Sequence, residues 1–292
     1  AMACLLFAAR FSERGRDRDL WLAGVLGGLA VGAKSTGVFL GIPLTVACLW
    51  RKRGPRSLLR GALAAAWAFV VANPFAVVHL GTFLQNLARQ GAILRGAVEA
   101  PYTLQYHRTL PYVYPWVQQL RWGLGWLVGS CAAVGLIYEG VRVVTAERPR
   151  PGPWVLLAWA VPTFAFVGGL YVKFPRYVLP VLPVLVIYAA AVLVAATEKR
   201  PLLFRIASGL LVGLSLVRAA ALAGMYRAPH PWVAASEWLS TRAAPGARIA
   251  VEAWDHPLPV DGGSYELLEL PVFDEESDEK WETMRGVLER AD

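Results

Sequence analysis

Long apolar runs dominate the sequence and restrict the folds that are open to it. Five of them are about 20 residues long, which is the length of a helix that crosses ~30 Å of hydrocarbon at about 1.5 Å per residue. They lie at 58–78, 121–141, 153–171, 178–196 and 203–224. With 56% hydrophobic and 17% charged residues, the composition is too apolar for a soluble domain. We expect residues 1–224 to form an all-α polytopic membrane bundle.

Basic side chains cluster in four connections between the apolar segments and indicate how the helices are oriented. These connections contain Arg10, Arg14, Arg16 and Arg18; Arg51, Lys52, Arg53, Arg56 and Arg60; Arg142, Arg148 and Arg150; and Lys199, Arg200 and Arg205. The positive-inside rule makes them cytoplasmic. The other connections, around Lys34, over 79–120, at Lys173–Tyr177 and after 225, then face outward. The sequence therefore predicts a multi-pass protein of the cytoplasmic (plasma) membrane with an extracytoplasmic C-terminal tail.

Charge is distributed unevenly between the membrane part and the tail. Residues 225–292 contain 14 acids and 6 bases, whereas residues 1–224 contain 7 acids and 23 bases. The net charge of +8 thus combines basic membrane edges with an acidic tail. Because the bases lie at these edges, the expected partner is membrane lipid, and a nucleic-acid partner is disfavoured.

A short apolar pair over 20–50 turns at Lys34-Ser35-Thr36-Gly37. Each arm has about 14 residues and spans ~21 Å, so we expect the tip to lie below the external surface or in a water-filled cavity. Glycines in the first arm favour close helix packing. Ser35 or Thr36 is expected to cap the second arm, which would leave its N-terminal amides facing a phosphate beside Lys34. A lysine that reaches lipid head groups is the alternative.

A second pair of cations stands in Lys173-Phe174-Pro175-Arg176-Tyr177. Arg and Lys are rare where an apolar span ends unless they reach lipid phosphates or hold an anion. The topology assigned from charge places this turn on the same external side as Lys34. This turn is therefore a candidate for holding an anion.

The connection over 79–120 contains an amphipathic pattern. Apolar residues recur at the spacing of a helix lying on the membrane, at Phe83, Leu84, Leu87, Ile93 and Leu94. Pro74, shortly before this segment, is expected to kink or end the preceding span.

Aromatic and hydrogen-bonding residues alternate from Pro101 to Trp116. Sugar rings stack on aromatic faces, so this segment predicts a sugar or lipid-sugar surface, and a plain interfacial aromatic belt is the alternative. The candidate sugar or acceptor contacts are Tyr102, Gln105, Tyr106, His107 and Arg108. Glu99 is the one acid of the connection. It is the candidate general base, with a solvated glutamate at a helix end as the alternative.

The tail over 225–292 predicts the start of a small external α/β domain. A helix over Pro231–Arg242 precedes a turn at Ala244-Pro245-Gly246, strands over 248–253 and 267–273, and a last helix from about 276. Asp255 and His256 are assigned to a surface turn. The histidines are scattered and the cysteines, Cys4, Cys48 and Cys131, lie in apolar spans. We therefore expect no metal site and predict no cofactor.

Three segments together resemble a known membrane family. The stretch Leu26–Gly37 is similar to a Gly-Leu-Ala then Lys-x-Thr-Gly segment, and Lys173–Pro183 to an Arg-Tyr-x-x-Pro-x-x-Pro segment. Ser236–Leu239 followed by Ala244–Ala250 is similar to the external start after the last core helix. The segments that they resemble are those of polyprenyl-phosphate-sugar-dependent glycosyltransferases of the GT-C superfamily. Within it, the similarity is to the dolichyl-phosphate-mannose protein mannosyltransferase-like and aminoarabinose-transferase-like proteins, and it covers most of the chain.

The resemblance implies a GT-C type bundle that transfers a sugar from a polyprenyl-phosphate donor to an acceptor on the extracytoplasmic face. Such transfer needs a carboxylate that takes the acceptor proton and cations that stabilise the departing phosphate. Lys34, Lys173, Arg176 and Tyr177 fit the donor-phosphate role. The family's acidic motif would precede Ala1, so we expect a fragment, truncated at both ends and inactive alone.

Two other functions stay open at this point. A transporter or flippase for an anionic lipid-linked substrate would also place cations beside interrupted helices. A structural or assembly protein whose acidic tail binds a partner is the third alternative.

Overall fold

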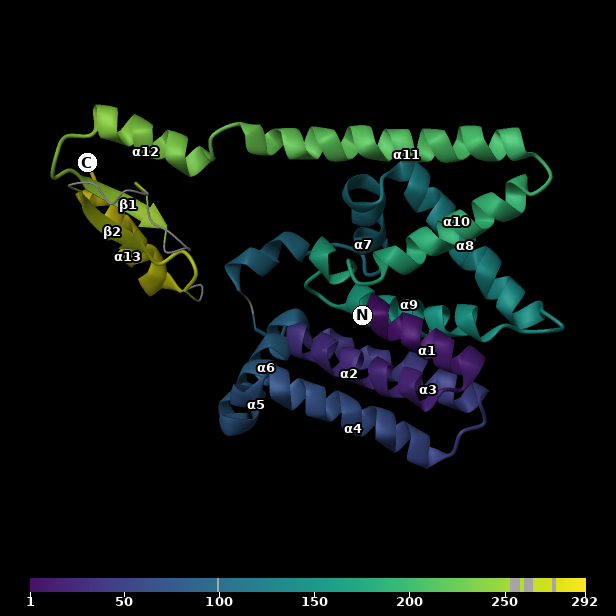
Figure 1. The fold of residues 1–292 in the computed structure, drawn as a ribbon. Helices are drawn as coiled ribbons and strands as arrows, with labels where there is room; N and C mark the ends of the chain where they lie inside the picture. The colour runs from purple at the N-terminus through teal and green to yellow at the C-terminus, as the bar shows by residue number, and fades with distance from the viewer. Residues whose placement is uncertain (99, 253–257, 260–264, 275–276) are drawn as a thin grey trace. The chain divides into compact units, whose positions relative to one another are not determined.

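The computed structural model describes residues 1–98, 100–252, 258–259, 265–274 and 277–292, and it is mostly helical. It separates into two compact units, 1–94 with 108–211 and 95–107 with 212–292, and each is described by itself. The longer helices of the first unit (Figure 1) are α1 (Met2–Arg14), α2 (Asp17–Ala33), α3 (Gly41–Trp50), α4 (Pro55–Ala72), α6 (Leu80–Leu94), α8 (Trp126–Thr145), α9 (Pro151–Gly169) and α10 (Leu182–Thr197). The shorter ones are η1 (Ser35–Leu40), α5 (Pro74–Val78), α7 (Val113–Gln118), η3 (Gln119–Gly123) and η4 (Pro175–Tyr177). Helix α11 (Pro201–Gly224) runs from the first unit into the second.

Helices α2 and α4 pack tightly through small residues. A Cβ atom on Gly24 would lie 2.5 Å from the Gly61 carbonyl oxygen, and one on Gly28 would overlap the Ala65 carbonyl. A step of four residues along α2, from Gly24 to Gly28, corresponds to a step of four residues along α4, from Gly61 to Ala65. The two helices therefore run parallel. The prediction that glycines in the first arm allow close packing is confirmed.

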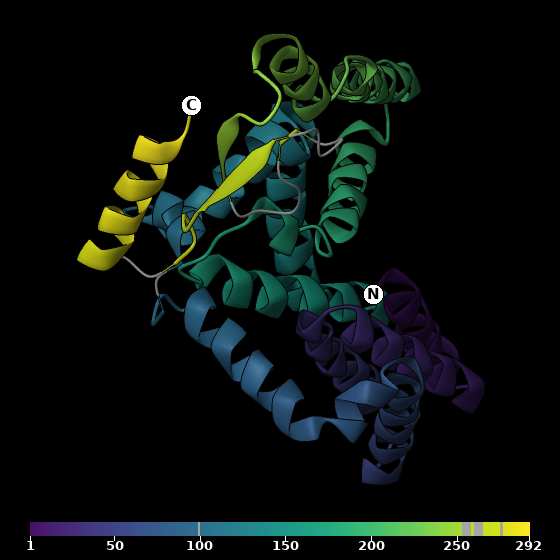
Figure 2. The same ribbon diagram turned by 90° about the vertical axis from the view of Figure 1, so that its left-hand side faces the viewer.

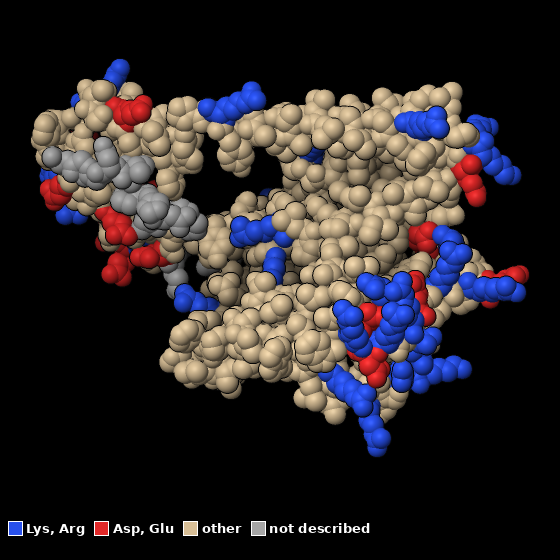
Figure 3. All heavy atoms as spheres, viewed as in Figure 1, with Lys and Arg blue, Asp and Glu red and all other residues tan. Residues whose placement is uncertain are grey.

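The first two basic connections meet where α2 and α4 begin. Arg53 donates to the Gly15 carbonyl at 3.1 Å and lies 3.6 Å from the Asp17 carboxylate. Arg60 lies 3.6 Å from the other oxygen of the same carboxylate. Figure 3 shows Lys and Arg side chains gathered over this end of α4. The helix starts thus bring together basic residues that are separated in the sequence.

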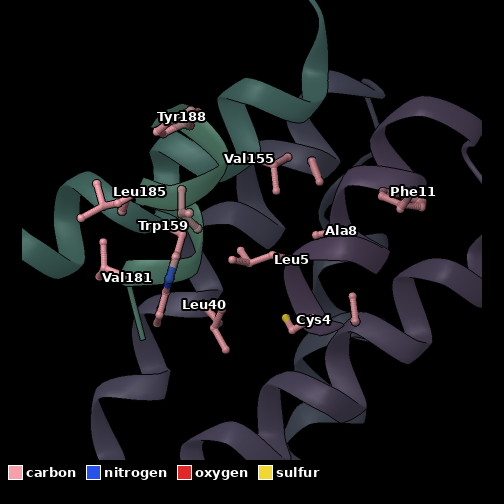
Figure 4. Packing of buried hydrophobic residues seen from close by; sticks show 14 of the residues in the cluster. Cys4, Leu5, Ala8, Phe11, Leu40, Val155, Trp159, Val181, Leu185 and Tyr188 are labelled. Atoms are coloured by element: carbon pink, nitrogen blue, oxygen red, sulfur yellow. The ribbon is translucent and has the colours of Figure 1, made fainter. Parts of the chain in front are cut away.

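The core of the first unit lies between α1, η1, α9 and α10 (Figure 4). Leu5, Leu40, Trp159 and Leu185 are almost completely buried there. The Trp159 indole nitrogen donates to the Pro180 carbonyl at 3.1 Å, so the large ring is buried with its one polar group satisfied. This bond also ties α9 to the segment that precedes α10.

Within the described residues, three helical stretches are long and apolar enough to cross a membrane. They are Trp126–Thr145, Pro151–Gly169 and Pro201–Arg242. The run predicted at 178–196 forms the shorter α10, which begins after the turn that contains Pro180. The continuous span predicted over 58–78 is wrong, because α4 ends at Ala72 and Pro74 starts the separate α5. The expectation that Pro74 kinks or ends this span is confirmed, because a proline nitrogen has no hydrogen to donate.

Helix α6 confirms the helix predicted from the apolar spacing between Phe83 and Leu94. Most of its side chains are exposed, and Ile93 is buried. The Leu94 carbonyl accepts hydrogen bonds from the backbone nitrogens of Tyr171 and Val172 at 3.0 and 3.2 Å. The end of α6 is therefore attached to the connection that carries Lys173.

The second unit contains the tail and the short η2 turn (Pro101–Tyr106). In the tail, α12 (Pro231–Arg242) precedes β1 (Arg248–Glu252) and β2 (Glu266–Leu270), which pair in parallel, and α13 (Asp278–Arg290) follows. Figure 2 shows α13 beside the two strands. The turn places Gly246 at φ +83°, a conformation that suits glycine. The predicted helices and strands of the tail are confirmed, although Asp255 and His256 lie outside the described residues.

Candidate functional site

The structure brings Lys34 to the Lys173–Tyr177 connection. Lys34 follows α2, and its ammonium nitrogen lies 4.6 Å from the centroid of the Tyr177 ring. Burial lowers the pKa of Lys34, and the neighbouring positive charge of Arg176 lowers it further. Two connections that are far apart in the sequence thus hold like charges close together. We call Lys34, Lys173 and Arg176 the cation cluster.

Lys173 is the buried member of the cation cluster. Lys173 is 3% exposed, and its ammonium donates to Thr109 Oγ1 at 3.1 Å and to the Tyr171 carbonyl at 2.9 Å. Burial lowers the pKa of this amine. Lys34 is half-buried and Arg176 is exposed, so these two are the cations that an anion reaches directly. Lys173 belongs to the same connection as Arg176, and its ammonium is engaged by Thr109 and Tyr171.

Arg176 lies against aromatic rings. Its guanidinium carbon is 4.1 Å from the centroid of Phe174 and 5.9 Å from that of Tyr177. The ion pairs formed by the described residues include none of the three cluster members. An anion placed between Lys34 and Arg176 would relieve the repulsion between them, because it favours the charged form of both.

Gln119, which lies in a third segment of the chain, forms a hydrogen bond to the Lys173–Tyr177 connection. Its side-chain nitrogen donates to the Pro175 carbonyl at 2.9 Å, and the residue is 2% exposed. Its side-chain oxygen is buried without a hydrogen-bond partner. Gln119 opens the π-helical turn η3, and the lack of a side chain at Gly123 leaves room for its amide. Sequence reasoning missed Gln119, because nothing in the local pattern distinguishes it from a surface glutamine.

The segment over 108–112 supplies the partner of Lys173 and has an unusual backbone. Arg108 and Tyr112 have φ angles of 60° and 61°, which side-chain-bearing residues seldom adopt. The Tyr112 nitrogen donates to the Gly168 carbonyl at 2.9 Å, and its ring covers Gly168 and Gly169. This contact attaches the segment to the end of α9. Backbone strain of this kind is typical of functional sites.

The predicted sugar contacts are divided between the two units. Tyr102, Gln105, Tyr106 and His107 belong to the second unit, whereas Arg108 begins the next part of the first. Tyr106 is buried, and the Gln105 side chain donates to the Tyr102 carbonyl at 2.8 Å. Gln105, His107 and Arg108 are exposed.

Glu99, the candidate general base, lies outside the described residues.

The expected cap by Ser35 or Thr36 is wrong. Helix η1 starts without a side-chain cap, and Gly37 instead donates its backbone hydrogen to the Lys34 carbonyl at 2.8 Å. The chain forms a tight 3-10 turn at the tip, so the helix start that these hydroxyls would cap is absent there. Among the described residues, no group of three His, Cys, Asp or Glu could hold a metal.

Comparisons of the chain with protein-family models, with curated proteins and with solved structures give no match.

Proposed function

We propose that this chain is the core of a membrane glycosyltransferase of the GT-C type. In this proposal it transfers a sugar from a polyprenyl-phosphate donor to an acceptor on the extracytoplasmic face, and Lys34 and Arg176 bind the donor phosphate. The observation that supports it is the approach of Lys34 to Tyr177 and Arg176, in a helical chain with stretches of membrane-spanning length.

The chemistry of sugar transfer makes use of such a cluster. The acceptor oxygen forms a bond to the anomeric carbon while the bond from that carbon to the phosphate oxygen breaks. The acceptor proton passes to a general base, and the lipid phosphate leaves with the electron pair and gains a second negative charge. Cations that are already in place therefore stabilise the transition state more than the bound donor.

Each member of the site has a distinct role in this proposal. Lys34 and Arg176 contact the phosphate, because they are the accessible cations. Lys173 anchors the connection by its hydrogen bond to Thr109. Tyr177 keeps the Lys34 ammonium near Arg176. The sugar and acceptor roles of Tyr102, Gln105, Tyr106, His107 and Arg108 remain predictions, and the general base is not assigned.

A transfer assay on the natural full-length protein tests the proposal. Labelled polyprenyl-phosphate sugar is supplied in proteoliposomes, and both cleavage of the donor and its movement across the bilayer are measured. We expect cleavage that Arg176→Ala reduces severely without preventing membrane insertion. Arg89→Ala, which removes an exposed arginine from α6, is the control and should retain activity.

The same assay distinguishes the alternative function. Movement of the intact donor without cleavage would instead support a transporter or flippase. Turnover at the wild-type rate in Arg176→Ala would contradict the phosphate role.

A further inference from the structure

A groove between α2 and α4 lies apart from the cation cluster. Its volume is about 760 Å³, which falls in the range of about 300–1,000 Å³ occupied by small-molecule sites. The groove is at the end of α2 near Asp17, whereas Lys34 follows the opposite end. The 17 residues of α2 separate the two places by about 25 Å.

The middle of the groove is apolar. Leu20 and Ala64 form a buried floor, and Trp21, Leu63 and Trp67 form exposed walls. The Trp21 and Trp67 ring centroids are 6.4 Å apart, and the two residues are 52% and 58% exposed. Walls of this kind suit a hydrocarbon chain, because their burial removes a large apolar area from water.

One end of the groove is positively charged. Arg18 and Arg60 line it together with Asp17. The Asp17 carboxylate is shared by Arg53 and Arg60 at 3.6 Å each. Its single negative charge therefore does not neutralise Arg18, Arg53 and Arg60 together. Arg18 takes part in none of the ion pairs that the described residues form. This end therefore carries a net positive charge that is available to an anion.

The charged end and the apolar walls of the groove lie on the same face of α4. Residues 60, 63, 64 and 67 of α4 share one face, so the charged end leads directly onto the apolar walls. Arg60 and Trp67 are about 10 Å apart along the axis. The groove thus presents a charged group and an apolar track in the order in which a phospholipid carries its phosphate and its acyl chain.

We propose that this groove binds an anionic phospholipid, with the phosphate at Arg18 and Arg60 and an acyl chain along Leu20, Ala64 and the two tryptophans. A zwitterionic lipid is disfavoured, because its ammonium group would face the same arginines. The proposal is independent of the glycosyltransferase function, since it uses none of the residues of the cation cluster.

Native mass spectrometry of the full chain in detergent tests the proposal. The protein is titrated with phosphatidylglycerol and with phosphatidylcholine that have identical acyl chains. We expect tighter binding of phosphatidylglycerol. The R18Q/R60Q variant should weaken it about 25-fold, at about fivefold for each charge removed, and should leave phosphatidylcholine nearly unchanged. The charge-retaining R18K/R60K variant should keep most of the affinity, and Trp67→Ala should weaken both lipids.

Two controls decide between a specific site and general surface charge. Arg205→Gln removes an exposed arginine from α11 and should not change the binding. Arg89→Gln removes an exposed arginine from α6 and should not change it either. Equal affinity for the two lipids, or an equal loss in R18Q/R60Q and in either control, would overturn the proposal. If the double variant does not fold, Arg18→Gln alone is measured, and it should weaken phosphatidylglycerol about fivefold.

Discussion

The Lys34 ammonium lies 4.6 Å from the centre of the Tyr177 ring, with the Arg176 guanidinium 5.9 Å from the same ring. The ring attracts both cations by its electron-rich face, while the cations repel each other. Burial and this repulsion both lower the pKa of Lys34. The arrangement is therefore one that an anion would stabilise.

Removal of the Tyr177 ring is the direct test of this relationship. In Tyr177→Leu we expect the affinity for polyprenyl phosphate to fall about two- to fivefold, because a cation–π contact at a partly exposed site contributes about 0.5–1 kcal/mol. Calorimetric titration in detergent measures the change. Tyr177→Phe keeps the aromatic face and should bind nearly as well as the wild type. An equal loss in both variants would instead indicate a role for the hydroxyl group.

The lowered pKa values of Lys34 and Lys173 predict how stability depends on pH. Both pKa values are below the ordinary 10.5, chiefly because of burial. The folded chain therefore holds these protons less tightly than the unfolded chain. The charged amines lower stability at pH values below their folded pKa values, and this cost disappears as the pH rises to the ordinary value.

Anion binding should show the opposite trend, because it requires the protonated amine. We expect the affinity for polyprenyl phosphate to fall as the pH rises from about 8 towards 10.5, a range in which the phosphate is already fully ionised. Binding measured across this range is the test. Lys34→Arg stays charged throughout and should show a smaller decline. A wild-type affinity that is constant up to pH 10.5 would contradict a role for these lysines.

Gln119 is expected to support the Lys173–Tyr177 connection through its bond to the Pro175 carbonyl. Gln119→Leu should lower the free energy of unfolding by about 1 kcal/mol, because it removes this bond and also the unpartnered oxygen. Gln119→Glu should cost about 3 kcal/mol, because a buried carboxylate cannot donate to a carbonyl. Denaturant unfolding in detergent gives both values. If the glutamate variant is the more stable of the two, the assigned hydrogen bond is wrong.

A substitution at Gly28 tests the close packing of α2 against α4. A Cβ atom there would overlap the Ala65 carbonyl, so Gly28→Ala should destabilise the chain by about 1–3 kcal/mol. Gly209 in α11 is the matched control, because a Cβ atom there would meet no atom within 4 Å. Gly209→Ala should stabilise the helix by up to about 1 kcal/mol. Thermal unfolding of the two variants should show shifts of opposite sign in the unfolding temperature. Equal shifts would argue against close packing of α2 on α4 at Gly28.

Much of the helical architecture was predictable from local pattern. Several helices begin at a proline, as at Pro55, Pro151 and Pro231, because the first turn of a helix needs no backbone donor from that residue. Apolar periodicity located α6, and alternation with turn residues located the strands of the tail. The cap at Ser35 or Thr36 was predicted wrongly, because the same residues also suit a 3-10 turn and the local sequence does not distinguish the two.

Most helices, the basic connections and the residues that could hold an anion are predictable from the sequence alone, because propensity, periodicity and charge are local properties. The packing of distant segments is what brings Lys34 to Tyr177, bonds Gln119 to Pro175 across 56 residues, and buries Lys173 with its ammonium donating to Thr109. These contacts depend on how distant segments pack against each other. No local pattern carries that information, since the same side chains would be equally compatible with exposure to solvent or lipid.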